Sequence, residues 1–280
     1  MIRGGIFWIA SYPKSGNTWI RCLLASLLSD GAPPDLAQLG RFCRNGADRA
    51  LIESVVGEET GRMSAAQLIE ARGAAYRHLA ADGLGRRCLK VHDRWLAALF
   101  PLEATVGCVH IVRDPRDVVV SLAAHLAIPV DAAIDFMSRR DSVLFGAPDG
   151  ADNQAPQLLG SWSEHVAGWR ALSDRPLLSL RYEDMLADPH AAAVRLAAFL
   201  ELKASAELIA RAVAACGFEN LKAFEDERGF VEKPAKMQRF FREGRSGGWR
   251  NVLTASQSDR VVELHGAAMR GLGYGVERDA

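Results

Sequence analysis

Apolar residues along the chain form short runs and longer helical patterns that follow one another in a regular order. Residues 6–10 are a continuous apolar run, typical of a strand buried on both faces of a parallel sheet. A turn follows, and between residues 18 and 28 the apolar positions recur at helical spacing. The same order returns at residues 106–112, where an apolar run leads through Asp114-Pro115 into a helical pattern. This alternation of strand and helix favours an α/β fold.

Weaker patterns complete the predicted fold. Strands are predicted at residues 87–92 and 176–181, and helices at residues 64–82, 190–201, 205–215 and 255–271. Residues 30–63 and 127–157 show no clear periodicity, so we expect long loops, which in compact domains commonly form lids or binding walls. No internal repeat or linker interrupts the chain. We therefore expect one domain over residues 1–280.

Composition narrows the classes of protein to consider. The 280 residues are 49% hydrophobic, and 34 Lys and Arg balance 34 Asp and Glu. This is the composition of an ordinary soluble globular protein, and the absence of net charge argues against a general polyanion binder. The N-terminal apolar run is too short for a signal peptide, and no run approaches the ~20 apolar residues that span a bilayer. We expect a cytoplasmic protein that binds neither nucleic acid nor membranes.

The segment between the first strand and the first helix concentrates residues suited to bind phosphate. It reads Ser11-Tyr12-Pro13-Lys14-Ser15-Gly16-Asn17-Thr18-Trp19. A helix start offers unpaired N–H groups and the positive end of its dipole, Gly16 allows close backbone approach, and Lys14 adds a charge. Alternatively, Ser15 or Asn17 caps the helix and Lys14 points to solvent. The density of polar residues favours phosphate, although the loop is not a Walker A motif because its lysine precedes the glycine.

At this loop the chain resembles the cytosolic-type sulfotransferases, which use 3′-phosphoadenosine 5′-phosphosulfate (PAPS) as donor. Further segments resemble family motifs in the same order: Lys90-Val91-His92, Val112-Arg113-Asp114-Pro115-Arg116-Asp117 with Ser121, Gly160-Ser161-Trp162 with Trp169, Arg181-Tyr182-Glu183-Asp184-Met185, and Phe241-Arg242-Glu243-Gly244 with Trp249. The matches span nearly the whole chain. The resemblance implies a PAPS-dependent sulfotransferase with a single-domain, P-loop-like fold, in which helices flank a parallel sheet on both sides.

The resemblance also implies where the donor binds. It assigns the 5′ end to Lys14, Ser15, Gly16, Asn17 and Thr18, the 3′-phosphate to Arg113, Ser121, Arg242 and Gly244, and the adenine to Trp19, Tyr182 and Phe218. From the residues alone, Arg113 ends a strand and Ser121 lies about two helical turns further on, so both can reach one phosphate. The alternative is a surface arginine paired with Asp114 or Asp117, and a serine that faces solvent.

Three positions depart from the family pattern at the expected donor site. Glu243 stands where the family usually has Lys, which places a negative charge at an expected phosphate contact. Arg242 and Arg245 are close enough in sequence to compensate. Gly248 replaces the usual Asp, and Cys216-Gly217 replace a hydroxyl pair before Phe218.

Sulfuryl transfer requires a cation at the leaving phosphate and a base for the acceptor hydroxyl. We predict that His92 takes the acceptor proton and that Lys14 stabilises the leaving oxygen. We expect Ser121 to tune Lys14, and Lys90, two residues before His92 on one strand, to face the same side and stabilise the acceptor anion or the transferring group. On residue type alone, a histidine after a strand is an ordinary packed or capped residue more often than a base. Its place among the ordered motifs favours the base.

We expect the remaining aromatic and cysteine residues to have structural roles and not to form a second functional site. His165 lies at helical spacing with Trp162 and Trp169, which predicts one packed helix face. The five cysteines are scattered without a CxxC pair, so we expect neither disulfides nor a zinc site. The sulfotransferase scheme needs no metal, because Lys14 and Arg113 supply the positive charge.

Two other functions fit parts of the pattern. One is an ATP-dependent P-loop phosphotransferase in which Asp114 binds Mg²⁺. The other is a non-catalytic sensor of adenosine 3′,5′-bisphosphate in which His92 is idle. A chelator that abolished turnover would favour the first, and a complete lack of transfer would favour the second.

The acceptor and the oligomeric state are less constrained. We expect residues 30–63 and 127–157 to build the acceptor pocket, and these segments contain Phe42, Phe136, Met137 and Phe145 but also Arg41, Arg44, Arg139 and Arg140. This mixture does not identify a substrate. The Lys-x-His arrangement and the absence of an extended basic stripe suit a compact hydroxyl acceptor, such as a phenol or alcohol, better than a long polyanion. A saccharide, lipid or natural product is the alternative. Residues 250–259 have the spacing of the family's dimer motif, which makes a homodimer one interpretation. The other is a plain helix start with Thr254 as its cap.

Overall fold

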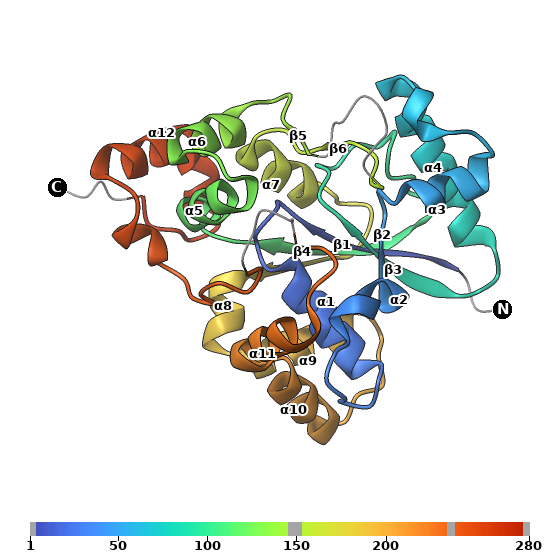
Figure 1. Ribbon diagram of the computed structural model, residues 1–280. Coiled ribbons are helices and arrows are strands. Elements are labelled where there is room, and N and C mark those ends of the chain that lie inside the picture. Colours follow the sequence, from blue (N-terminus) through green and yellow to red (C-terminus); the bar gives the residue numbers. More distant parts are fainter. Residues whose placement is uncertain (1–3, 145–152, 234–238, 277–280) are drawn as a thin grey trace. The chain divides into compact units, whose positions relative to one another are not determined.

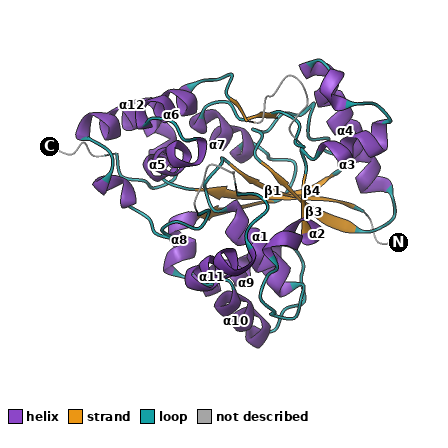
Figure 2. Ribbon diagram, in the orientation of Figure 1, coloured by secondary structure: helices purple, strands orange, loops and turns teal. Residues whose placement is uncertain are grey.

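The computed structural model describes residues 4–144, 153–233 and 239–276 and contains a five-stranded sheet. The strand order is β2 (Cys43–Asn45), β3 (Arg86–Val91), β1 (Gly5–Ser11), β4 (Thr105–Val112) and β7 (Leu177–Arg181). Figure 1 labels β1, β2, β3 and β4, and Figure 2 draws the strands in orange. β1 runs parallel to β3, and β3 runs parallel to β2. The predicted α/β fold, a parallel sheet flanked by helices, is confirmed.

Strand β1 is the central strand of the sheet, and the phosphate loop follows its end. It lies between β3 and β4, and all seven of its residues are buried, as its unbroken apolar sequence predicts. Trp8 packs edge-on against Tyr76 and Phe100, with ring centroids 4.9 Å apart in both pairs. The indole N–H of Trp8 donates to Thr105 Oγ1 at 3.0 Å. These contacts hold the strand rigidly up to the residues that follow it.

The chain folds as two compact units, each assembled from three segments. Unit 1 comprises Met1–Tyr12, Cys43–His110 and Arg139–Ser179, and unit 2 comprises Pro13–Phe42, Ile111–Ser138 and Leu180–Ala280. Unit 1 therefore contains the predicted base His92, whereas unit 2 contains most of the predicted donor-binding residues. That both units form one domain stays a prediction.

Unit 1 carries three longer helices and a two-stranded ribbon. They are α3 (Arg49–Val56), α4 (Ala65–Ala81), α7 (Trp162–Arg170), β5 (Val143–Leu144) and β6 (Gln157–Leu158), with the 3₁₀ turn η2 (Thr60–Arg62). Capping boxes at Ser64 and Ser161 start α4 and α7. Trp162, His165 and Trp169 are buried on α7, as the predicted packed face requires.

Unit 2 is mostly helical. Its helices are α1 (Asn17–Leu27), α2 (Leu39–Phe42), α5 (Pro115–Leu126), α6 (Val130–Ser138), α8 (Tyr182–Ala187), α9 (Pro189–Phe199), α10 (Ala206–Ala215), α11 (Phe218–Arg228) and α12 (Ala255–Gly271), with the 3₁₀ turns η1 (Leu36–Gln38) and η3 (Gly248–Asn251). Asp114 caps α5 and Pro115 is its first residue. Thr254 caps α12 through a capping box, as the helix-start interpretation of residues 250–259 predicts.

The two segments expected to be long loops contain regular structure, so that expectation was wrong in part. Residues 30–63 include α3 and the edge strand β2, and residues 127–157 include α6. α3 and α6 span only eight and nine residues and β2 only three, so each shows too few repeats of its apolar pattern to be recognised. Phe145, named for the acceptor pocket, lies outside the described residues.

Membrane-spanning potential is confined to one bent pair of helices. Within residues 4–144, 153–233 and 239–276, no single helix is long and apolar enough to cross a bilayer. Together α5 and α6 meet the length and composition criteria, but their axes are bent by 113°.

Candidate functional site

The loop after β1 turns sharply before α1 begins. Lys14 and Gly16 both have positive φ angles, 69° and 104°, and Gly16 is the N-cap of α1. A Cβ atom on residue 16 would lie 2.7 Å from Cδ2 of Tyr182, so the backbone conformation and the adjacent ring both require glycine. The buried Oγ atom of Ser15 has no hydrogen-bond partner among the described residues. The loop thus combines the N–H groups of a helix start with an unused hydroxyl, as a phosphate site requires.

Lys14 is enclosed by groups that disfavour its charge. Its Nζ atom lies 4.0 Å from the centroid of the Phe240 ring, so the lysine does not extend into solvent as the alternative interpretation had it. Burial, which is the largest cause, and the positive charges of Arg113 and Arg242 together lower the pKa of Lys14 to about 8, while Glu225 opposes them. Bound phosphate would stabilise the protonated amine at this position.

Arg113 is held by backbone carbonyls and an aromatic ring. It donates from Nη1 to the Lys14 carbonyl at 3.2 Å and from Nη2 to the Arg245 carbonyl at 2.9 Å, and its guanidinium lies 4.4 Å from the centroid of the Tyr182 ring. Pairing with Asp114 or Asp117, the alternative considered from sequence, does not occur. Asp114 forms an ion pair with Arg116 at 2.7 Å, and Asp117 accepts from two backbone N–H groups of residues 247 and 249.

Aromatic side chains surround this part of unit 2. The rings of Trp19 and Tyr182 meet edge-on with centroids 5.9 Å apart, and the Trp19 indole donates to the Cys216 carbonyl at 3.1 Å. Phe218 packs closely on Gly244, where a Cβ atom would lie 2.2 Å from Cδ2 of the ring. The three rings named for adenine therefore lie in the same unit as the cations named for phosphate, and their role stays a prediction.

Glu243 lies close to Arg242 and Arg245, the two arginines expected to compensate for its negative charge. Its carboxylate lies 2.8 Å from Arg245 Nε and 3.8 Å from Arg242 Nη2. A Cβ atom on Gly248 would lie 3.2 Å from Glu243 Oε2 and 3.8 Å from an oxygen of Asp117. Glu243 and Gly248, two of the three departures from the family pattern, therefore lie next to each other, and an acidic residue at 248 would add a third carboxylate there.

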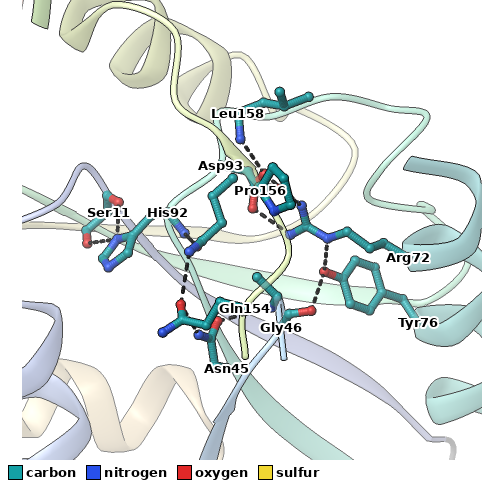
Figure 3. Close-up of polar contacts among 12 residues, drawn as sticks. Ser11, Asn45, Gly46, Arg72, Tyr76, His92, Asp93, Gln154, Pro156 and Leu158 are labelled. Atoms are coloured by element: carbon teal, nitrogen blue, oxygen red, sulfur yellow. Dashed lines mark hydrogen bonds and ion pairs between the residues drawn. The ribbon is translucent and has the colours of Figure 1, made fainter. Parts of the chain in front are cut away.

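His92 directly follows β3 and is oriented by the backbone of Ser11 (Figure 3). Its Nδ1 atom lies 2.8 Å from the Ser11 carbonyl oxygen and 3.3 Å from Ser11 Oγ. A carbonyl can only accept, so Nδ1 carries the hydrogen and Nε2 is the basic nitrogen. The backbone N–H of His92 donates to Oε1 of the buried Gln157 at 3.2 Å. This is the tautomer that a general base acting through Nε2 requires.

Lys90 and Ser121 occupy the elements predicted for them. Lys90 lies in β3, paired in register with Ile9 and Asn45, and is buried. Ser121 lies in α5 and is half-buried. Both roles stay predictions.

Several residues that shape the site carry little sequence signal. The carbonyl of Ser11 orients His92, Gln157 accepts from its backbone, and the buried Glu225 accepts from the N–H groups of Phe240 and Phe241. Backbone carbonyls and distant side chains cannot be recognised from residue type. Asp93 is the exception, because a carboxylate next to the predicted base is visible in the sequence.

His110 and His165 of unit 1 are packed residues, as the helical spacing predicted for His165. His110 and His165 are fully buried with ring centroids 5.6 Å apart, and Tyr12 meets His165 edge-on at 5.6 Å. Burial lowers the pKa of His165 to about 3, which keeps it neutral at physiological pH. Among the described residues, no group of three or more His, Cys, Asp or Glu side chains could hold a metal ion.

A family model described as "Sulfotransferase domain" matches residues 6–273. The chain therefore belongs to the sulfotransferase family. Among curated sulfotransferases, it is 25% identical to flavonol 3-sulfotransferase of Flaveria bidentis over 92% of this chain and 79% of that protein. It is 24% identical to human sulfotransferase 2B1 over 97% of this chain and 68% of that protein. The predicted membership in this enzyme family is confirmed.

Solved structures share the fold of this sulfotransferase. Retinol dehydratase in a complex with retinol and PAP aligns with a TM-score of 0.66 and 21% identity, over 96% of this chain and 82% of that chain. Mouse sulfotransferase SULT7A1 complexed with PAP aligns with a TM-score of 0.58 and 19% identity, over 95% of this chain and 85% of that chain. The predicted sulfotransferase fold is thereby confirmed.

Proposed function

We propose that this sulfotransferase moves a sulfuryl group from PAPS to a hydroxyl group of a small-molecule acceptor. The observation that carries the proposal is the arrangement around Arg113 in unit 2. Its guanidinium binds the Lys14 carbonyl and stacks on Tyr182, which in turn packs on Gly16 at the start of α1. Two cations, a helix N-terminus and aromatic rings match a nucleotide that carries phosphates. The PAP complexes of the two solved relatives support the same donor chemistry.

In this proposal, three groups of residues bind three different parts of PAPS. The loop residues Lys14, Ser15, Gly16, Asn17 and Thr18 bind the 5′ end, and Arg113, Ser121, Arg242 and Gly244 bind the 3′-phosphate. Trp19, Tyr182 and Phe218 contact the adenine. The planar guanidinium of Arg113 suits bidentate binding of phosphate oxygens.

The chemical step is an in-line transfer to the acceptor oxygen. A bond forms between that oxygen and sulfur, the bond from sulfur to the 5′-phosphate oxygen breaks, and Nε2 of His92 receives the acceptor proton. The products are a sulfate ester and adenosine 3′,5′-bisphosphate. Protonated Lys14 stabilises the leaving oxygen, Ser121 tunes that lysine, and Lys90 stabilises the acceptor anion or the transferring group.

The acceptor is proposed to be a small hydroxyl compound, and the setting cytoplasmic. The names of the relatives, a flavonol sulfotransferase and cytosolic sulfotransferases of Arabidopsis thaliana, support both parts of this proposal. We also propose that residues 30–63 and 127–157 contact the acceptor. No nucleic acid or membrane partner is proposed, and a homodimer through residues 250–259 stays an alternative to a plain helix start.

Incubation with ³⁵S-labelled PAPS tests the proposal. The acceptor panel comprises phenols, sterols, primary alcohols, sugars and a cell extract, and the readouts are labelled sulfate ester and released adenosine 3′,5′-bisphosphate. We expect equal amounts of both products with at least one acceptor. Donor binding without transfer to any of them would instead favour the sensor.

The geometry of Asp114 weighs against an ATP-dependent phosphotransferase. Its two carboxylate oxygens bind Nε and Nη2 of Arg116 at 3.0 and 2.7 Å, and one of them also caps α5. A carboxylate held in this way is a poor candidate for a Mg²⁺ ligand. We therefore expect turnover to persist in the presence of a chelator.

A further inference from the structure

Arg72 of α4 makes a fully buried, two-point ion pair with Asp93 (Figure 3). Nη1 lies 2.9 Å from Oδ1 and Nη2 lies 2.6 Å from Oδ2, with 1% and 0% of the two side chains exposed. Two further N–H groups of Arg72 are also used. Nη1 donates to the Pro156 carbonyl at 3.1 Å, and Nε donates to Tyr76 Oη at 3.2 Å, whose hydroxyl donates to the Gly46 carbonyl at 2.9 Å. The guanidinium is therefore fixed in one orientation.

Asp93 connects this pair to the segments around His92. Its Oδ1 atom accepts from the Leu158 N–H at 2.8 Å, and its carbonyl accepts from the Trp169 indole at 2.9 Å. His92, the preceding residue, donates its own N–H to Gln157, the residue before Leu158. Residues 92 and 93 are thus hydrogen-bonded to β6 through Gln157 and Leu158, and to α7 through Trp169.

We propose that the Arg72–Asp93 pair positions His92 for proton transfer. This inference rests on the proposed function of His92 as the base. Because Asp93 is fixed by the arginine fork, the peptide between residues 92 and 93 cannot rotate, and the imidazole is held where Nδ1 donates to the Ser11 carbonyl. Arg72 touches no reacting atom in this scheme and acts only through Asp93.

The chemistry of the pair favours positioning over packing. Removing two charges from water opposes folding, and well-packed apolar side chains would stabilise the same place at least as well. A two-point ion pair instead gives one defined geometry. The same helix and strand offer a natural comparison, because Arg87 at the start of β3 binds both oxygens of Asp82 at the end of α4, at 2.8 and 2.7 Å. That second pair lies at the opposite end of β3 from His92.

The test compares Arg72→Lys with Arg87→Lys. Each change keeps the charge and removes the guanidinium, so each remaining carboxylate keeps a cation nearby. The readouts are kcat with a productive acceptor, the dissociation constant of adenosine 3′,5′-bisphosphate, and the ¹⁵N spectrum of the His92 ring, which reports the tautomer. We expect Arg72→Lys to lower kcat about tenfold or more without weakening nucleotide binding, and to replace the single Nδ1–H tautomer by a mixture. Arg87→Lys should leave all three readouts unchanged.

Several results would overturn the inference. They are an unchanged kcat in folded Arg72→Lys, an equal loss of kcat in Arg87→Lys, or a mixed His92 tautomer already present in the wild-type protein. If Arg72→Lys does not fold, the double variant Arg72→Met/Asp93→Leu removes both charges together and should show the same loss of kcat and of tautomer. If the wild type transfers no sulfuryl group, the proposed function fails, while the ¹⁵N spectra still decide whether the pair holds the imidazole.

Discussion

Nδ1 of His92 faces the carbonyl oxygen of Ser11, the last residue of β1, at 2.8 Å. A backbone carbonyl, and not a carboxylate, therefore sets the tautomer of the proposed base. Ser11 stands three residues before Lys14, so the segment that orients the base leads directly into the phosphate loop.

Replacement of His92 should separate chemistry from binding. We expect His92→Ala to lower kcat about 10²- to 10⁴-fold, the usual range for loss of a general base. The dissociation constant of adenosine 3′,5′-bisphosphate, measured by titration calorimetry, should not change, since the residues proposed to bind it belong to unit 2. His78→Ala, at an exposed position of α4, is the control. Retention of activity in His92→Ala would contradict the proposed base.

Nucleotide affinity should depend on pH through Lys14. Burial lowers the pKa of this lysine to about 8, so in the free protein the amine loses its proton as the pH rises through that value. Binding of a phosphate requires the protonated form, and affinity should therefore fall about tenfold per pH unit above this point. Without ligand, stability changes in the opposite direction, because the unfolded chain keeps this proton up to its ordinary pKa of 10.5.

Calorimetric titrations at about pH 7.5 to 9.5 test this dependence, since phosphate groups are already ionised in that range. Lys14→Arg keeps a charge that does not titrate there and should bind with little dependence on pH. Parallel pH dependence in the wild type and Lys14→Arg would show that another group is responsible.

Gly16 should not tolerate a side chain. Gly16→Ala places a Cβ atom 2.7 Å from Tyr182 Cδ2 and forces alanine to a φ of 104°, so we expect weaker nucleotide binding and a loss of about 1–3 kcal/mol in unfolding free energy. Gly57→Ala is a matched control, because Gly57 has a φ of 74° and a Cβ atom there would have no heavy atom within 4 Å. Equal effects of the two changes on unfolding by denaturant would attribute the loss to backbone strain alone.

Removing the charge of Glu243 should strengthen binding of adenosine 3′,5′-bisphosphate. Its carboxylate is 43% exposed and forms ion pairs with Arg242 and Arg245, which partly neutralises both arginines. Exposed ion pairs contribute about 0.2–1 kcal/mol, so we expect Glu243→Gln to increase the affinity for the nucleotide only a few-fold. Glu219→Gln, an exposed acid on α11, controls for net charge. Weaker binding in Glu243→Gln would mean that this carboxylate organises the arginines instead of competing for them.

The neighbouring Gly248 allows a test of coupling between the two positions. Gly248→Asp alone should weaken nucleotide binding, because its carboxylate would approach those of Glu243 and Asp117. Glu243→Lys in the same chain should reverse much of that loss. Additive effects in calorimetry would show that the two positions are independent.

The sequence predicts the elements that carry continuous apolar runs or clear helical periodicity, and the residues next to them. β1, β4, α1 and α5 lie within two residues of their predicted positions, because strands buried on both faces and capped helices have strong local signals. α3 and α6 were missed because they span only eight and nine residues, so their apolar positions repeat for only about two turns.

The candidate site divides in the same way. Arg113, Lys14 and Gly16 could be named from motif and spacing, but the partners of Arg113 could not. They are two backbone carbonyls and a ring, from residues 14, 245 and 182, and residue type gives no signal for such contacts. The ion pair between Arg72 and Asp93 joins residues far apart in sequence, so nothing in the sequence indicated it either.

The interleaving of the two units limits how this chain can be divided or recombined. The polypeptide passes from one unit to the other five times, and two of these passages fall inside strands, at residues 110–111 in β4 and 179–180 in β7. No single cut can release either unit as an intact module. The proposed base and the proposed nucleotide-binding residues must therefore be inherited together, and transplanting one half onto another scaffold, or splitting the protein for fragment complementation, would break the sheet itself.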